Sequence, residues 1–161
     1  MIKAYSVYQP WAQLIVNGIK TCDARHFHVD YLGPVAIHAP SKTEYVPYNA
    51  ICTSAPMHYH LINLGYLRID RERRIRWVTH PPRMAIVGVV DLTEIHMVTD
   101  ELIEGMDPMQ RSLCWRLAPG LNLMVFENPR VLDEPIPYSY ESTGRPRLKD
   151  FDERLLPAGI L

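Results

Sequence analysis

Apolar and polar residues alternate along several short stretches of this chain, and a period of two residues is typical of β-strands. The longest stretch, RMAIVGVVDLTEI, begins at Arg83, and a shorter one, GPVAIHAP, begins at Gly33. Prolines and glycines separate the stretches, which favours turns between short strands. The segments that we predict to be extended are residues 2–8, 20–25, 33–40, 83–95, 113–118, 121–128 and a proline-bounded edge at 129–138.

Apolar residues at intervals of three and four predict helices between these strands. Pro10 stands where a helix would begin, because its fixed φ suits the first helical position, and Trp11, Leu14 and Ile15 follow on one face. Gly18 then supplies a left-handed stop. Two further short helices are predicted at residues 57–65 and 99–105.

Together these elements predict one domain of mixed α/β (α+β) class, since 161 residues is near the usual size of a single domain. Five to seven short strands with a few short helices favour a small β-barrel decorated by helices. Residues 41–82 are the least regular part and resemble an insertion into that core. Residues 142–161 mix charged residues with breakers, so we predict a tail on the surface.

The charge balance narrows the classes of partner. The chain has 17 Lys and Arg against 18 Asp and Glu, so no overall positive field draws in nucleic acid or an anionic membrane, and recognition must be local. Three isolated cysteines, no secretory apolar segment at the start and no apolar run long enough to span a bilayer predict a soluble cytoplasmic protein with reduced thiols.

Three charged residues follow the first predicted helix in the stretch QPWAQLIVNGIKTCDAR, which runs from residue 9 to residue 25. Lys20 emerges from the turn after Gly18, and the period of a strand places Asp23 and Arg25 on one face with Thr21. The polar side chains of this segment are therefore expected to converge.

This stretch resembles the signature of the ASCH domain, a branch of the PUA-like superfamily. The family pattern is G-x-K-x-x-E-x-R; Gly18, Lys20 and Arg25 match it in register, and Asp23 stands where the family usually has glutamate. The strands GPVAIHAP and AIVGVVDL and the late segment ENPRVLDEPIP follow in the family order, so the resemblance spans about residues 2–137. It implies a small PUA-like β-barrel, binding of RNA or nucleosides and, in some members, hydrolysis of N4-acetylated cytidine.

The chemistry of the three charged side chains allows two functions. Lys20 and Arg25 could hold a phosphate or a base carbonyl while Asp23 accepts hydrogen bonds from an exocyclic amine, as reading a cytosine or adenine requires. Alternatively, Lys20 could lose its proton in a desolvated cleft and act as a catalytic base or nucleophile, with Thr21 and Asp23 in support. A purely structural Asp23–Arg25 ion pair is the third interpretation.

Three residues outside the motif are weaker candidates for ligand contacts. Gln9 stands just before the predicted helix, Trp11 fits a core anchor better than a ligand contact, and His38 is equally compatible with the cleft and with the core. Two His-x-His pairs, at 26–28 and 58–60, lack further ligands at supporting spacing, so we predict no metal. No glycine-rich phosphate loop is present, and we predict no cofactor.

Arginines are concentrated in the predicted insertion, next to an aromatic residue at Trp77. Such an edge suits tracking of a phosphate backbone with stacking of a base, and a solvated β-ribbon with cross-strand ion pairs is the alternative. Our hypothesis is a binder of RNA, a nucleobase or a nucleoside; an amidohydrolase with Lys20 as base and a protein-interaction adaptor are the competitors. The arginines that we predict to contact phosphate are Arg71, Arg73, Arg74 and Arg76.

Overall fold

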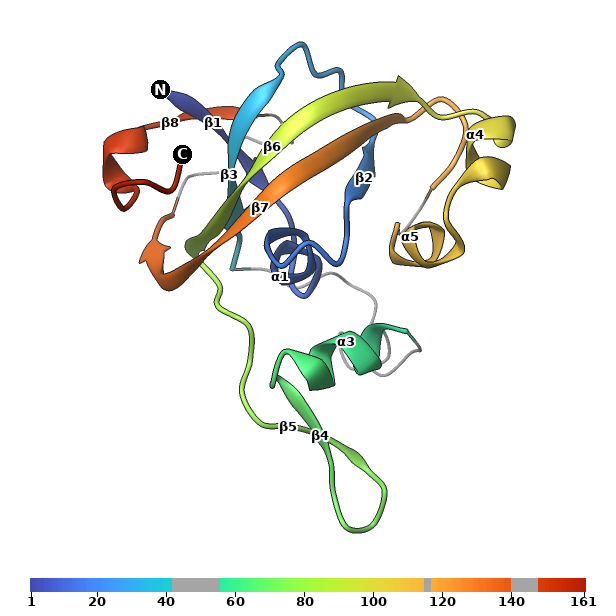
Figure 1. Ribbon diagram of the computed structural model, residues 1–161, viewed down its shortest axis with the longest axis vertical. Coiled ribbons are helices and arrows are strands. Elements are labelled where there is room, and N and C mark those ends of the chain that lie inside the picture. The colour runs from blue at the N-terminus through green and yellow to red at the C-terminus, as the bar shows by residue number, and fades with distance from the viewer. Residues whose placement is uncertain (42–55, 115–116, 140–147) are drawn as a thin grey trace.

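A six-stranded mixed sheet forms the centre of the molecule, with the strand order β2-β7-β6-β3-β1-β8 (Figure 1). The structure is a computed structural model, and it describes residues 1–41, 56–114, 117–139 and 148–161. β1 pairs with β3 in parallel, and the other neighbours in the sheet are antiparallel. The strands are β1 (Ile2–Ser6), β2 (Cys22–Arg25), β3 (Gly33–Ala39), β6 (Ala85–Met97), β7 (Asn122–Pro137) and β8 (Lys149–Phe151).

The helices are short and lie around this sheet. α1 covers one face of it, while α4 and α5 lie beyond one end of β6 and β7 (Figure 1). α3 leads into a separate two-stranded hairpin. The bounds are α1 (Trp11–Val16), α3 (Met57–Asn63), α4 (Asp100–Gly105), α5 (Pro108–Leu113) and the 3-10 turn η1 (Glu153–Leu155), and the hairpin strands are β4 (Leu67–Ile69) and β5 (Ile75–Trp77).

The predicted α/β class is confirmed in its mixed form, but the closed barrel is not found. Among the described residues the pairing begins at β2 and ends at β8, and these two strands do not pair with each other. β6 has 13 residues, the length of the segment predicted at 83–95, whereas β7 is one strand of 16 residues in place of the two segments predicted at 121–128 and 129–138. No helix in the described part of the chain is long and apolar enough to cross a membrane.

β7 continues through Pro129, where we predicted a break between two segments. Glu127 pairs with Asp91 and Arg130 with Val89, so Asn128 and Pro129 form a bulge opposite one residue of β6. The extra residue of a bulge makes no hydrogen bond to the neighbouring strand, so a proline, which has no amide hydrogen, is tolerated there. The φ of 46° at Asn128 bends the strand at the same point.

α1 packs so closely on the sheet that a glycine is required beneath it. All six residues of the helix are buried, and its predicted stop is confirmed at Gly18, which has a φ of 72°. A Cβ on Gly88 of β6 would lie 2.6 Å from the carbonyl oxygen of Arg130 and 2.7 Å from Cγ1 of Val16. The contact between α1 and the sheet therefore depends on the absence of a side chain at this position.

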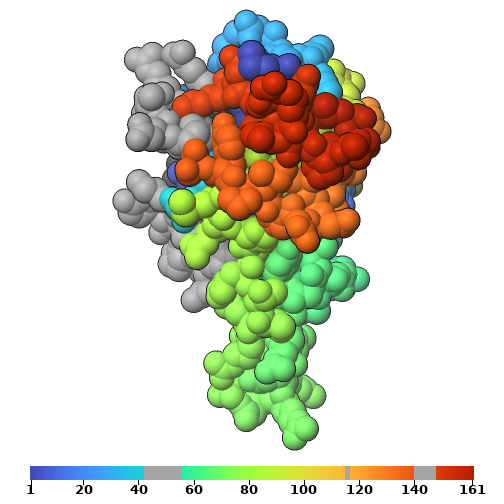
Figure 2. All heavy atoms as spheres, turned by 90° about the vertical axis from the view of Figure 1, so that its left-hand side faces the viewer, coloured from blue at the N-terminus to red at the C-terminus, as the bar shows by residue number. Residues whose placement is uncertain are grey.

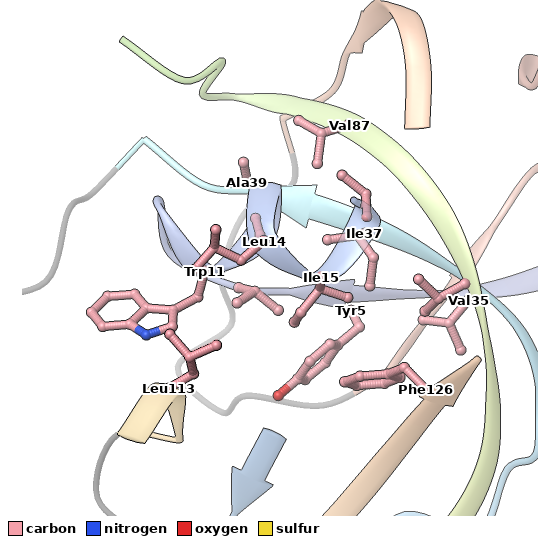
Figure 3. Packing of buried hydrophobic residues seen from close by; sticks show 14 of the residues in the cluster. Tyr5, Trp11, Leu14, Ile15, Val35, Ile37, Ala39, Val87, Leu113 and Phe126 are labelled. Atoms are coloured by element: carbon pink, nitrogen blue, oxygen red, sulfur yellow. The ribbon is translucent and has the colours of Figure 1, made fainter. Parts of the chain in front are cut away.

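Buried apolar side chains form one main core and two smaller clusters. The main core lies between α1 and the sheet, and Figure 3 shows Tyr5, Ile15 and Phe126 within it. A second cluster on the other face includes Phe151 of β8, so part of the predicted tail completes the sheet edge beside β1. The third cluster joins β2 to the end of α5.

The hairpin β4–β5 extends away from the rest of the molecule (Figures 1 and 2). It is a charged β-ribbon, with Arg68 paired opposite Arg76. Its root is attached to the main core, since Leu61 of α3 and Leu67 of β4 are both buried there. The tip of the hairpin is therefore exposed while its base is anchored.

Candidate functional site

Lys20 is the centre of a buried polar cluster beneath the edge of the sheet. The end of α1 delivers it there: the amides of Ile19 and Lys20 donate to the carbonyl oxygen of Leu14, which turns the chain back under the helix. Gln110 of α5 fixes the same turn: its Nε2 donates to the carbonyl oxygen of Ile19, and its Oε1 accepts from the backbone amide of Thr21. The Lys20 side chain is completely inaccessible to solvent.

Three acceptors surround the ammonium group of Lys20. Its Nζ donates to the carbonyl oxygen of Cys22, lies 3.1 Å from Oδ1 of Asp23 and 3.3 Å from Sγ of Cys114. An ammonium group has three N–H donors, so this set satisfies all of them. Burial alone would lower the pKa of Lys20, but the charge of Asp23 and the neighbouring sulfurs outweigh burial and raise it, so Lys20 is a cation at neutral pH.

Asp23 connects this buried cation to the surface. Its Oδ2 accepts from the hydroxyl of Tyr5 and lies 2.9 Å from Nε of Arg25. Burial would raise the pKa of this carboxyl, but the charges of Lys20 and Arg25 and the hydrogen bond from Tyr5 hold it below the ordinary value. Asp23 is therefore an anion, and 11% of its side chain remains exposed.

Tyr5 and Arg25 form the outer part of the cluster. The Tyr5 ring belongs to the main core beside Phe126, as Figure 3 shows, and its hydroxyl also accepts from Nε of Arg25. The guanidinium carbon of Arg25 lies 5.4 Å from the centre of the Tyr5 ring, within the range of a cation–π contact. With 27% of its side chain exposed, Arg25 is the most accessible of the three charged residues of the motif.

The predicted convergence of the motif is confirmed for its three charged residues, but Lys20 is less exposed than a residue lining a cleft would be. Lys20, Asp23 and Arg25 are brought together, but Lys20 is sealed from solvent. A pocket of about 360 Å³ beside Gly18 and Thr21 is lined by the Lys20 residue, yet Asp23 is not among its described lining residues. A cleft bordered by both Lys20 and Asp23 stays a prediction.

Gln9 and Trp11 are placed in the packing around α1. The Gln9 side chain is buried, with its Nε2 donating to the carbonyl oxygen of Pro82 at 2.7 Å and its Oε1 accepting from the amide of Gln13 at 3.1 Å. Trp11 is 7% exposed within the main core. Both positions fit a structural role, and a ligand contact at either remains a prediction.

His38 lies on the other face of the sheet from the Lys20 cluster. Tyr5 and Ser6 are neighbours in β1, so their side chains project in opposite directions, and the structure pairs Ser6 with His38. Nε2 of His38 lies 3.0 Å from the carbonyl oxygen of Tyr138, which can only accept, so the proton sits on Nε2 and Nδ1 accepts from Ser6 at 2.9 Å. Burial lowers the pKa of His38, and the ring is neutral there.

The predicted phosphate-contacting arginines lie in the hairpin, but they differ in their partners. Nε of Arg74 and Nε of Arg76 lie 3.1 and 3.2 Å from Asp70, which also accepts from the backbone of the tip. Within the described residues, Arg71 and Arg73 form no ion pair. These two are therefore the cations that a phosphate would meet first.

Sequence analysis missed Tyr5, Cys22, Cys114 and Gln110 as members of the site. Tyr5 and Gln110 contact the motif through pairings between distant strands and helices, and no local pattern marks them. Among the described residues no cluster of three or more His, Cys, Asp or Glu is arranged to hold a metal. The three cysteines were recognised as isolated in sequence, and only the fold brings Cys22 and Cys114 together.

The fold is similar to that of solved ASCH structures. The crystal structure of ASCH from Zymomonas mobilis is 12% identical and covers 95% of this chain and 89% of that chain, with a TM-score of 0.51. A serine-to-alanine variant of the same protein gives 12% identity, the same shares and a TM-score of 0.50. No protein-family model and no curated protein sequence matches the chain. The chain therefore has the fold of an ASCH domain.

Proposed function

We propose that this chain binds RNA or a nucleoside through a base that carries an exocyclic amine, at the surface formed by Asp23 and Arg25. The observation that supports this most strongly is the state of the Asp23 carboxylate. A carboxylate has about four lone-pair positions. Among the described residues Lys20 and Tyr5 donate to this carboxylate and Nε of Arg25 lies 2.9 Å from it, so at most three positions are occupied and at least one remains beside the accessible guanidinium group.

An anionic acceptor next to a cationic donor matches the edge of cytosine or adenine. Each of these bases presents an amine that donates and a ring nitrogen that accepts, and single-stranded RNA exposes these groups to proteins. Uracil has a carbonyl in place of the amine, and that oxygen would face the Asp23 carboxylate. The arrangement therefore favours cytosine or adenine over uracil.

Lys20 acts in this proposal by holding Asp23 rather than by touching the ligand. Its three donors are all used, and its pKa is raised, so the charge of Lys20 keeps the carboxylate ionised and fixed in direction. The resemblance to ASCH domains and the shared fold are consistent with this ligand class, but neither identifies the base.

The hairpin provides a second contact if the ligand is RNA rather than a free nucleoside. Arg71 and Arg73 lie on the exposed hairpin, and the ring of Trp77 lies at its base, 4.7 Å from the ring of His80. Exposed cations and an aromatic ring on one hairpin suit a single-stranded backbone, and the affinity for such a ligand depends on salt. A nucleoside would use the Asp23–Arg25 surface alone.

The amidohydrolase alternative, with Lys20 as base and Thr21 and Asp23 in support, is less well supported. A general base must be partly neutral near its working pH. The environment of Lys20 has the opposite effect, since Asp23 and the sulfur of Cys114 stabilise its charged form. Exposed apolar side chains, such as Leu155 of the tail and Val131 of β7, are consistent with the adaptor alternative but identify no partner.

Isothermal titration of the protein with cytidine and uridine tests the proposal. We expect cytidine to bind more tightly than uridine, and Arg25→Met to weaken cytidine binding by about tenfold, which corresponds to about 1.4 kcal/mol. Arg130→Met is the matched control, because Arg130 pairs with Asp91 elsewhere on the sheet and is 25% exposed, close to the value for Arg25. Equal affinities for the two nucleosides, or equal effects of the two substitutions, would refute the proposed contact.

A further inference from the structure

Two buried cysteines beside Lys20 have no role in the proposed function. Cys22 lies in β2, and Cys114 caps the C-terminal end of α5, 92 residues later in the chain. Both are free thiols, and they are 5% and 4% exposed. Their Sγ atoms are 3.3 Å apart, a contact that neither the strand nor the helix requires for its own hydrogen bonding.

The charges around the pair make the two sulfurs unequal. Nζ of Lys20 lies 3.3 Å from Sγ of Cys114. The hydrogen bond from Cys22 and the charge of Lys20 outweigh burial and lower the pKa of the Cys114 thiol to about 7. The same hydrogen bond and burial raise the pKa of Cys22. Cys114 is thus the thiolate-forming sulfur, and Cys22 keeps its proton.

The local charge count agrees with this assignment. With Cys114 ionised, the two cations Lys20 and Arg25 face two anions, Asp23 and Cys114. A neutral Cys114 would leave the cluster with one excess positive charge in a largely buried place, which is unfavourable.

We propose that Cys114 and Cys22 form a peroxide-sensitive thiol pair, in which Cys114 attacks a hydroperoxide and Cys22 completes an intramolecular disulfide. The proposal concerns the sulfur pair alone and holds whether or not the neighbouring surface binds a nucleoside.

The reaction balances with hydrogen peroxide as the oxidant. The Cys114 thiolate attacks one peroxide oxygen, the O–O bond breaks, and the product is a sulfenic acid and a hydroxide ion that takes up a proton as water. Cys22 then attacks the Cys114 sulfur; the S–S bond forms, the S–O bond breaks, and the leaving hydroxide takes the proton of Cys22 as a second water. The two sulfurs are oxidised by two electrons in total, and the peroxide is reduced to water.

The geometry indicates which sulfur moves and which oxidant fits. The Sγ atoms must approach by about 1.3 Å to reach the length of a disulfide bond. Cys22 is held in the β-ladder opposite Val125, whereas Cys114 is the C-cap residue that follows the short helix α5. Cys114 is therefore the more readily displaced of the two. A small oxidant such as hydrogen peroxide reaches a buried thiol pair more readily than a bulky disulfide does. We therefore expect hydrogen peroxide to oxidise the pair faster than oxidised glutathione.

Mass spectrometry of the full chain tests this inference, with Cys52→Ser as the background so that only the pair contributes thiols. Hydrogen peroxide should remove both titratable thiols, lower the mass by about 2 Da and yield a peptide that links Cys22 to Cys114. With Cys22→Ser, Cys114 should stop at the sulfenic acid and be trapped by dimedone. With Cys114→Ser, Cys22 should remain a thiol.

Lys20→Met separates the electrostatic role of the lysine from a packing role. Without the cation, oxidation of Cys114 should slow by about tenfold at neutral pH, and the rate should approach that of the unmodified protein above about pH 10, where the thiolate forms unaided. A rate lowered equally at all pH values would contradict the role given to Lys20. Sulfenic acid at Cys22 in the Cys114→Ser variant, or no linked peptide after peroxide treatment, would overturn the proposal itself.

Discussion

Asp23→Asn removes a mostly buried carboxylate that faces two cations, and we expect a large loss of stability. In the folded protein Asp23 lies 3.1 Å from Nζ of Lys20 and 2.9 Å from Nε of Arg25, and 11% of its side chain is exposed. The asparagine leaves Lys20 as a fully buried cation without its carboxylate partner. Breaking a buried pair in this way costs about 3–5 kcal/mol, a large part of the total stability of an ordinary domain.

Urea unfolding at neutral pH, followed by tryptophan fluorescence, measures this loss from the midpoint at an unchanged slope. Asp91→Asn is the matched control: Asp91 also pairs with an arginine, Arg130, but both side chains are about a quarter exposed. We expect the control to lose about 1 kcal/mol or less. Equal losses in the two variants would refute the conclusion that the Lys20 cluster is electrostatically tight.

Two further observations identify the cause of the loss. The pKa of Asp23 is lower in the folded protein than its ordinary value of 3.8, so its contribution to stability is complete above that value and is lost as the pH falls through the folded pKa. The gap between the unmodified protein and Asp23→Asn should therefore narrow in acid. The double variant Lys20→Met with Asp23→Asn should lose less than the sum of the single variants, because it contains no unpaired lysine.

Gly88→Ala should destabilise the protein by about 1–3 kcal/mol, since the added Cβ would lie 2.6 Å from the Arg130 carbonyl oxygen and 2.7 Å from Val16. The midpoint of thermal unfolding measures this loss, and an unchanged midpoint would show that α1 can move away from the sheet. Arg71→Gln combined with Arg73→Gln should flatten the dependence of log affinity on log salt by about 1.4 units for a single-stranded RNA, because two phosphate contacts are lost. A titration at several salt concentrations measures that slope, and an unchanged slope would assign the hairpin arginines to the solvated surface.

Local patterns were sufficient to predict the elements that are stabilised by their own sequence. The first strand, the helix that follows Pro10 and the stop at Gly18 were predicted because proline, glycine and apolar spacing act within a few residues. The prediction of a strand at residues 113–118 is wrong at its start, since Leu113 ends α5. Asp107 and Pro108 form an ordinary helix start, which that interpretation overlooked; Trp115 and Arg116 lie outside the described residues.

The site was predictable only in the part that one segment contributes. The spacing of Lys20, Asp23 and Arg25 placed their charges together, which is confirmed. The depth of Lys20 depends on α5 and its cap residue Cys114 lying against it, and those contacts join residues about 90 positions apart. Alternation along a strand specifies which side chains share a face, and it does not specify which face another element covers.

Nuclear magnetic resonance of the arginine side chains tests the central claim most directly, because the Nε–H group of Arg25 points into the site. We predict that titration with cytidine shifts the Arg25 Nε resonance to saturation, that uridine at the same concentration shifts it less, and that the Arg130 resonance stays constant. No change at Arg25 while cytidine binds elsewhere, or equal changes at Arg25 and Arg130, would contradict the proposal that Asp23 and Arg25 recognise the base.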